Sequence, residues 1–445
     1  MARSSVAKKY GVRVARRQHE RTDPRRFAAI VVWPTTGTDD PVSHGDVGAV
    51  FYYGMRALLV YYMTRQLMIG QEKASLIYGA YTATSFLTPI FGGIIADRWL
   101  GNRRAVIIGG TIMAIGHFLM TFDSLLYVAL ATIALGNGLF LPSLPSQIND
   151  LYEPRDPRRA RAYNIYYVGI NLGGFLAPLV CGTLGEFYGW HWGFAAAGVG
   201  MFLGLTVYIS GGKYLPTVKR RETQAADAPA NSKSTLILLV GIALAVTVFR
   251  GAYEQVGNTV ALWAETGVDR QVGSAVIPMT WFQALNPLLV FLMTPLLLSR
   301  WKRRTEPGAM RKMATGAIIV ALAYSLLAGV AAWAGPGEAS WIWLAGFFVV
   351  YTWGELHILP TGLGLFARLA PAGFAATTVA AWFLATFSGS LAAGAVGTLW
   401  SSVHHARFFV ILAALAAGAA GMLLTMDRSS SRIETERAGE PAATR

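Results

Sequence analysis

The stretch "GGIIADRWLGNRR", residues 92–104, changes within a few positions from an apolar helix to a charged, glycine-containing loop. An apolar run over 76–96 leads into it, and a second apolar run over 105–122 follows it. Each run is close to the roughly 20 residues that an α-helix needs to cross a bilayer. The stretch therefore predicts a short connection between two membrane-spanning helices, at the membrane surface.

The composition of the whole chain is that of a membrane protein. Of its 445 residues, 54% are hydrophobic and only 14% are charged, whereas an average soluble domain is about 25% charged. Apolar stretches long enough to span a bilayer recur along the chain. Soluble classes of protein are therefore excluded.

The expected fold is an all-α polytopic membrane protein with about twelve transmembrane helices in two halves. Hydropathy and helix-breaking residues place these spans near 47–68, 76–96, 105–122, 126–149, 163–183, 189–210, 235–263, 274–299, 313–334, 340–367, 374–400 and 406–426. The longest polar connection has no apolar period, which is typical of a flexible linker. We therefore expect an N-terminal tail at 1–46, a six-helix bundle at 47–210, a linker at 211–234, a second six-helix bundle at 235–426 and a tail at 427–445.

Basic residues gather in the connections that follow every second span. These connections are "DRWLGNRR" (97–104), "EPRDPRRARA" (153–162), "KYLPTVKRRE" (213–222), "SRWKRR" (299–304) and "DRSSSRIETER" (427–437). Lys and Arg are enriched in cytoplasmic loops, so both termini and the linker are predicted on the cytoplasmic side. The same distribution accounts for the net charge of +14 without a nucleic-acid partner. The single cysteine, Cys181, offers no cysteine-based metal site, and no cofactor is expected.

A few polar side chains lie inside the predicted spans, where an ionisable group is costly and by default indicates function. They are Arg56, Asn171, Glu254, Gln255, Asn286 and Glu355. With the tyrosines and Trp382 of neighbouring spans, they predict a cavity with one cation, two anions and aromatic walls, which suits a zwitterion. The two asparagines could instead join helices by hydrogen bonds, and Trp382 could belong to the packing between helices.

Several segments resemble known transporter signatures. The opening stretch resembles the loop signature of the major facilitator superfamily, in which two helical halves rock around a midplane site. "FYYGMRALLVYYMT", "AYEQVGNTVALWA", "WFQALNPLLVFLMTPLL" and "GELHILPTGLGLFARLAPAGFAA" resemble successive signatures of the proton-dependent oligopeptide transporter (POT/PTR) family of that superfamily. The resemblance implies a symporter that imports di- and tripeptides with protons by alternating access, and not an enzyme. It also implies a monomer in the lipid of the cell inner membrane.

The resemblance assigns roles to individual residues. Arg56 matches the family arginine that holds the peptide carboxylate, Glu355 matches the acid that receives the amino terminus, and Glu254 matches the acid whose protonation is tied to transport. The other predicted substrate contacts are Tyr52, Tyr53, Asn171, Asn286 and Trp382. The loop predicted to tie neighbouring helix ends contains Gly93, Asp97, Arg98, Gly101, Arg103 and Arg104.

Three positions depart from the family pattern. Leu141 stands where the family has a lysine before the proline of span four, Phe86 replaces a tyrosine of span two, and Leu359 replaces a serine that follows the acid of span ten. One cation is thereby lost, and the pocket is expected to be more apolar than is usual in the family. These changes leave open a proton-independent or atypical facilitator or exporter of peptide-like compounds.

The segment before Arg56 lacks the acids that the family places there. A Glu-x-x-Glu-Arg-Phe pattern precedes the tyrosine pair in the family, whereas this chain has Gly45, Gly48, Ala49 and Val50 at the four specified positions. On this side, Arg56 therefore has no acid to pair with, although buried charges are normally compensated. When residues 33–50 are back-translated and read one nucleotide later, permitted codons spell "GQPRGLMTLFLTEMWERF", which contains the missing pattern.

This reading suggests the hypothesis that the chain from its N-terminal tail to residue 50 is a frame-shifted translation. The alternatives are a natural protein that lacks these acids, or a chain made inactive by a damaged first helix. Sequencing the gene across codons 25–55 tests the hypothesis, because an unbroken frame with confirmed bases rejects it.

A function outside transport is also left open by the sequence. A membrane-bound acyltransferase or sensor could use His357 beside Glu355. A histidine at that depth is the only feature that favours it.

Overall fold

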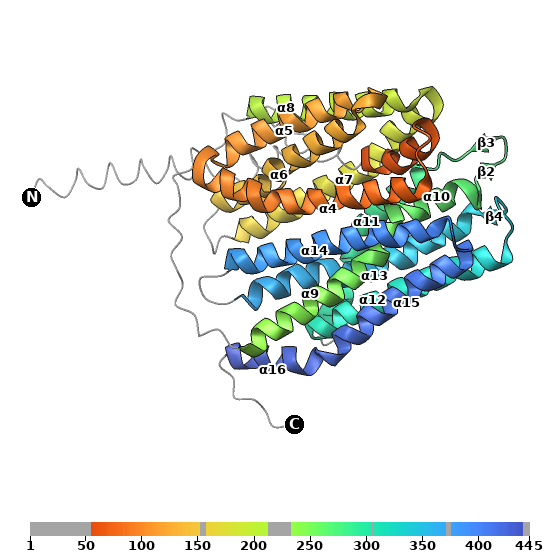
Figure 1. Ribbon diagram of the computed structural model, residues 1–445. Helices are drawn as coiled ribbons and strands as arrows, with labels where there is room; N and C mark the ends of the chain where they lie inside the picture. Colours follow the sequence, from red (N-terminus) through yellow and green to blue (C-terminus); the bar gives the residue numbers. More distant parts are fainter. Residues whose placement is uncertain (1–54, 152–156, 212–232, 304–306, 371–374, 439–445) are drawn as a thin grey trace, which may run out of the picture.

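The computed structural model describes residues 55–151, 157–211, 233–303, 307–370 and 375–438 (Figure 1). This part of the chain is almost entirely α-helical, as predicted, with two short pairs of β-strands. Tyr52, Tyr53, the segment of the frame-shift hypothesis and most of the predicted linker lie outside the described residues.

The first group of helices precedes the predicted linker. Residues 55–61 are helical and continue into a π-helical turn, η1 (Tyr62–Gln66). There follow α4 (Gln71–Ile95), η2 (Ala96–Leu100), α5 (Asn102–Leu119), η3 (Asp123–Leu125), α6 (Leu126–Leu151), α7 (Pro157–Tyr188) and α8 (Trp190–Gly211).

The second group of helices follows the predicted linker. It comprises α9 (Lys233–Tyr253), η5 (Glu254–Gly257), α10 (Thr259–Thr266), α11 (Trp281–Arg303), α12 (Ala309–Trp333), α13 (Trp341–Arg368), α14 (Ala375–Gly397), η6 (Thr398–Trp400), α15 (His405–Thr425) and α16 (Asp427–Ala438). Helix α16 lies in the predicted C-terminal tail.

Short strands connect helices of the second group. β1 (Val268–Asp269) pairs in parallel with β4 (Ala339–Ser340), and β2 (Gln271–Val272) pairs in antiparallel fashion with β3 (Ala275–Val276). The predicted span 274–299 begins too early, because this hairpin occupies its first residues and α11 begins only at Trp281. The hairpin turns at Gly273, whose φ of 62° favours glycine.

Nine helical stretches of the described chain are long and apolar enough to cross a membrane. Helices α4 and α5 occupy the positions predicted for spans two and three, although they are not among these nine. Large apolar side chains such as Phe91, Leu244 and Val410 are more than half exposed on helices, as contact with lipid requires. The count of twelve spans and the cytoplasmic termini stay predictions.

The same glycine contact joins a pair of helices in each group. A Cβ added at Gly109 in α5 would lie 2.7 Å from the carbonyl oxygen of Gly136 in α6. A Cβ added at Gly316 in α12 would lie 2.5 Å from the carbonyl oxygen of Gly354 in α13. The equivalent contact in equivalent helix pairs is what an internal repeat of the two halves would produce.

The two groups meet along α4 with α14 and α7 with α11 (Figure 1). At the first of these interfaces, a Cβ on Gly79 would lie only 2.5 Å from the Cα of Gly394, so the two backbones touch. Further along, Gln71 Nε2 donates to the carbonyl oxygen of Gly397 at 2.9 Å. Since Gln71 begins α4 and Gly397 ends α14, this contact lies at one end of the molecule.

Candidate functional site

A cavity of about 520 Å³ lies between the two groups of helices. Residues 55–61, α4 and α7 line it from the first group, and α9, α11, α13 and α14 line it from the second. The charged side chains among its described lining residues are Arg56, Arg250, Glu254 and Glu355. The cavity thus holds two cations and two anions, whereas the sequence predicted only one cation.

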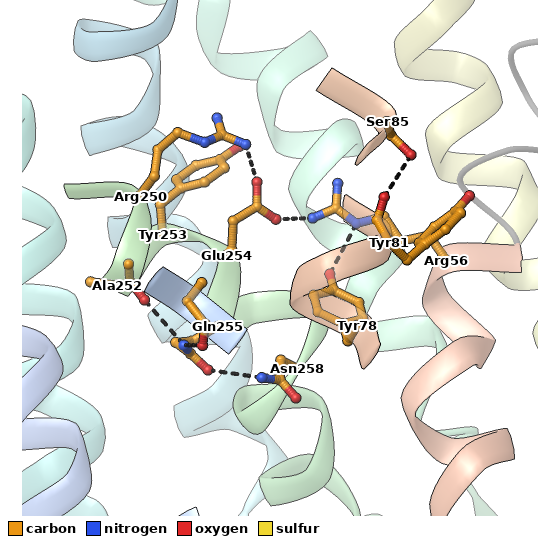
Figure 2. Close-up of polar contacts among 12 residues, drawn as sticks. Arg56, Tyr78, Tyr81, Ser85, Arg250, Ala252, Tyr253, Glu254, Gln255 and Asn258 are labelled. Carbon is orange, nitrogen blue, oxygen red and sulfur yellow. Dashed lines mark hydrogen bonds and ion pairs between the residues drawn. The ribbon is translucent and has the colours of Figure 1, made fainter. Parts of the chain in front are cut away.

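Glu254 lies between the two arginines (Figure 2). Its Oε2 accepts a hydrogen bond from Arg56 Nη2, and its Oε1 accepts one from Arg250 Nη2. The Glu254 side chain is 1% exposed, against 20% for Arg56. Because Arg56 precedes the predicted linker and Glu254 follows it, this carboxylate ties the two groups of helices together.

Within the described residues Arg56 therefore has an acid partner, while the segment before it, which lacks the acids of the family pattern, lies outside them. This counter-ion comes from η5, far away in the sequence. Sequence reasoning looked for a local partner, whereas the packing of the first span against the seventh supplies a distant one.

Aromatic side chains hold both guanidinium groups. Arg56 Nε donates to the Tyr78 hydroxyl at 2.9 Å, and its guanidinium carbon lies 5.6 Å from the centre of that ring. The guanidinium of Arg250 lies 4.6 Å from the ring of Phe86 and 5.3 Å from that of Tyr253. All three distances from a guanidinium carbon to a ring centre are within the range of cation–π attraction.

A break in the helix brings Glu254 to the cavity. Helix α9 ends at Tyr253, η5 begins at Glu254, and Asn258 has φ −118° and ψ −93° before α10 starts. Gln255 supports the break, since its Nε2 donates to the carbonyl oxygens of Gly251 at 3.1 Å and Ala393 at 2.7 Å. Interrupted helices of this kind frame the binding sites of many membrane transporters.

Gly257 lets Tyr78 approach this break. A Cβ at position 257 would lie 2.0 Å from the Tyr78 hydroxyl oxygen, so only glycine leaves room for the tyrosine that holds Arg56.

Glu355 forms a second acidic position in the cavity. Its Oε1 accepts a hydrogen bond from the Tyr253 hydroxyl at 2.7 Å, and its Oε2 accepts one from Asn286 Nδ2 at 2.5 Å. Asn286 also donates to Thr352 Oγ1 at 3.1 Å. Glu355 is thus held by neutral donors, whereas Glu254 is held by cations.

The structure brings most of the predicted substrate-binding residues and the predicted proton-coupling residue, Glu254, together. Those that line the cavity are Arg56, Asn171, Glu254, Asn286, Glu355 and Trp382. Asn171 bonds within its own helix to the carbonyl oxygen of Tyr167, whereas Asn286 bonds across to α13. Trp382 packs on Phe366, with ring centres 5.3 Å apart. Their roles toward a ligand stay predictions.

Two of the three departures from the family pattern affect the cavity directly. Phe86 and Leu359 are lining residues, as expected for a more apolar pocket. Leu141 is not among the described lining residues.

The predicted loop lies away from the cavity, between α4 and α5. Asp97 and Arg98 lie in η2, Gly101 turns the chain with φ 76°, and Arg103 and Arg104 are exposed.

The two adjacent glycines of this stretch differ in their contacts. Gly92, and not Gly93, makes the close helix contact: an added Cβ would lie 2.0 Å from the carbonyl oxygen of Gly138 at position 92, but no closer than 3.8 Å to Pro142 at position 93. The two positions differ because neighbouring residues face different sides of α4.

His357 is not among the described residues that line the cavity. Its Nδ1 lies 2.7 Å from the carbonyl oxygen of Trp353, and its ring packs against Trp301. It therefore does not join Glu355 in a shared site, and the acyltransferase or sensor hypothesis gains no support.

Sequence reasoning missed Arg250. The signal was present, since Arg250 precedes Glu254 by four residues and residues at that spacing share a helix face. It also missed Tyr167 and Tyr351 as lining residues, which in the sequence resemble ordinary aromatic residues of a span.

Comparison with known proteins connects this geometry to a family. The sequence model of the POT family matches residues 103–231 and 219–411. An uncharacterized transporter of Bacillus subtilis is 29% identical over an alignment that covers 84% of this chain and 90% of that protein. A di-/tripeptide transporter of Lactococcus lactis is 28% identical, with 81% and 88% covered. A crystal structure of the peptide transporter POT in complex with sulfate superposes with a TM-score of 0.81 at 27% identity, covering 92% of this chain and 99% of that one.

Proposed function

The chain belongs to the POT family of transporters, and on this premise we propose that it imports di- and tripeptides together with protons by alternating access. The family and its solved structures confirm the multi-pass membrane fold of the major facilitator type. Because the family is one of transporters, the prediction that the chain is not an enzyme is also confirmed. Proton coupling, the residues that carry it, the inner-membrane location and the monomeric state are part of the proposal.

The bridging position of Glu254 carries this proposal. A peptide carboxylate and the Glu254 carboxylate compete for the same guanidinium of Arg56, and an arginine fork binds a carboxylate well. A proton on Glu254 removes its charge and so frees Arg56 for the peptide. Proton and peptide thereby favour the same state of the protein, which is the thermodynamic requirement for symport.

Glu355 receives the other end of the peptide in this proposal. Its two hydrogen-bond donors, Tyr253 and Asn286, are neutral, so its negative charge is available to an ammonium group. A short peptide would then lie between Arg56 and Glu355, with Trp382 and Phe86 as apolar walls.

Uptake of a labelled dipeptide into proteoliposomes tests the proposal. We expect an inward proton gradient to drive accumulation in the wild type. The neutral glutamine of Glu254→Gln mimics the protonated acid but cannot release a proton. Gradient-driven accumulation of peptide should therefore fall by about tenfold or more, while exchange of peptide across the membrane persists. The matched control is Glu338→Gln, at an exposed glutamate in the connection before β4, which should behave as the wild type. Equal uptake by the wild type with and without the proton gradient rejects symport.

The apolar lining residues Phe86 and Leu359 favour a second candidate function, facilitated movement of peptide-like compounds without protons. The same assay identifies it by uptake that equilibrates and does not accumulate.

A further inference from the structure

Arg250 is the charged residue of the cavity to which the proposed transport cycle gives no task. Its side chain is only 6% exposed, and one of its amino groups binds Glu254. Within the described residues its Nε has no hydrogen-bond partner, although it lies among the residues that line the cavity. A buried guanidinium with an unused donor at a cavity wall is arranged to bind an additional acceptor.

Charge balance during the proposed cycle points to the nature of that acceptor. With Glu254 ionised, the two arginines and two glutamates of the cavity sum to zero. A proton on Glu254 leaves Arg56 and Arg250 facing Glu355 alone, which is a net charge of +1. A zwitterionic peptide satisfies Arg56 and Glu355 with its two termini and leaves Arg250 buried without a counter-ion, which is strongly unfavourable.

Among the described residues, the side chains around Glu254 supply no other anion. From the described helices these neighbours are Arg56, Tyr78 of α4, Arg250 and Tyr253 of α9, and Tyr324 of α12, and the tyrosines are neutral phenols. Glu355 interacts electrostatically with Arg250 but is bound by Tyr253 and Asn286 and is assigned to the peptide amino group. With no further anion among the described residues, the substrate is the source of the acceptor for Arg250 in this inference.

We propose that Arg250 is a specificity-determining residue that selects peptides with an acidic side chain on their C-terminal residue; this inference rests on the proposed function. Arg56 and Arg250 bind the two oxygens of one carboxylate, so their amino groups are close neighbours. The α-carboxylate and the side-chain carboxylate of a C-terminal Asp or Glu belong to one residue and can occupy both guanidinium groups together. An acidic side chain on the first residue lies closer to Glu355, which repels it.

Competition for binding tests this specificity on the full-length protein in detergent at pH 6. Unlabelled Ala-Glu, its neutral isostere Ala-Gln and the positional isomer Glu-Ala each displace a labelled dipeptide. We expect Ala-Glu to bind about tenfold more tightly than Ala-Gln, as a charge-assisted contact provides, and Glu-Ala to gain much less. Equal affinity for Ala-Glu and Ala-Gln in the wild type overturns the inference.

Two variants and a control assign the effect to Arg250. Arg250→Met should bring the affinity ratio of Ala-Glu to Ala-Gln to about one with Ala-Gln binding retained, and Arg250→Lys should restore part of the preference. Arg428→Met, at an exposed arginine of α16, should leave the ratio unchanged. An unchanged ratio in Arg250→Met overturns the inference, and if that variant binds no peptide, an undiminished ratio in Arg250→Lys overturns it.

Binding separates this inference from the proposed function. A preference for Ala-Glu in binding, without gradient-driven uptake, rejects symport and leaves the role of Arg250 standing. Gradient-driven uptake without a preference for Ala-Glu supports symport and rejects the role of Arg250.

Discussion

At the scale of single residues, two glutamates of the cavity differ because of what binds them. Glu254 accepts hydrogen bonds from two guanidinium groups, whereas Glu355 accepts them from a phenol and an amide. A carboxylate whose partners are cations already has its charge compensated. A carboxylate with neutral donors keeps a charge that an ammonium group can pair with, which is why the two acids are suited to different tasks.

This difference predicts how Glu355→Gln alters recognition of the peptide amino group. The wild type should bind Ala-Ala far better than N-acetyl-Ala-Ala, because the acetylated peptide has no ammonium group. In Glu355→Gln that discrimination should fall by about tenfold or more, since the charged partner is gone. Competition binding with the two peptides measures it.

Tyr253→Phe should have a smaller effect, because it removes only one hydrogen bond to Glu355. The control is again Glu338→Gln. Discrimination that survives intact in Glu355→Gln would place the amino group elsewhere.

At the scale of elements, small residues decide how closely helices pack. Without water, helix association in a membrane depends on close backbone contact, which glycine permits. Gly316 in α12 meets the backbone of α13, and a Cβ there would also lie 2.6 Å from Ile358 Cγ1. Gly329 on the same helix is exposed, and a Cβ there would meet nothing within 4 Å.

These two glycines predict opposite effects of the same substitution. Gly316→Ala should destabilise the protein by roughly 1–3 kcal/mol, because the new methyl group forces α12 and α13 apart. Gly329→Ala should stabilise it by roughly 0.4–1 kcal/mol, since alanine restricts the unfolded chain and meets no obstacle. Thermal unfolding in detergent compares the two directly. A lower melting temperature for Gly329→Ala than for Gly316→Ala would contradict the close contact of α12 and α13.

At the scale of the whole molecule, several polar contacts between the described parts of the two groups lie at one end. Arg65 Nε, near the end of the first span, lies 2.6 Å from Glu265 Oε1 at the end of α10. Glu186, near the end of α7, accepts hydrogen bonds at 3.0 Å from the backbone of Met279 and Thr280. Under the predicted topology this end is extracellular, and in the proposed alternating-access cycle these contacts would close it to the outside.

The pair of Arg65 and Glu265 tests whether this closure matters for transport. Arg65→Glu or Glu265→Arg alone places like charges together and should lower uptake about two- to fivefold, the modest effect of a partly exposed pair. The double variant restores opposite charges and should recover most of the activity.

A pair inside one group provides the control. Arg311 and Asp427 pair at 2.8 Å within the second group, so reversing their charges should leave the equilibrium between the two facing states unchanged. A double variant of Arg65 and Glu265 no more active than the single variants would exclude a role of their contact in closure.

The sequence alone determined the helical membrane class and the acids of the cavity. A run of about 20 apolar residues and the cost of a charge inside it are local properties, readable wherever they occur. Glu254, Glu355 and Arg56 were therefore predictable one by one. The family resemblance added their roles, which stay predictions.

Only the tertiary structure decided which charges meet. Arg56 pairs with an acid of the other helix group because the first span packs against the break after α9, and no local pattern contains that contact. Arg250 is visible in the sequence as a neighbour of Glu254 on one helix face. Its place at the cavity, against the ring of Phe86 in α4, appears only in the packed structure. Electrostatic energy depends on distance in space and on burial, and both arise only when the helices pack.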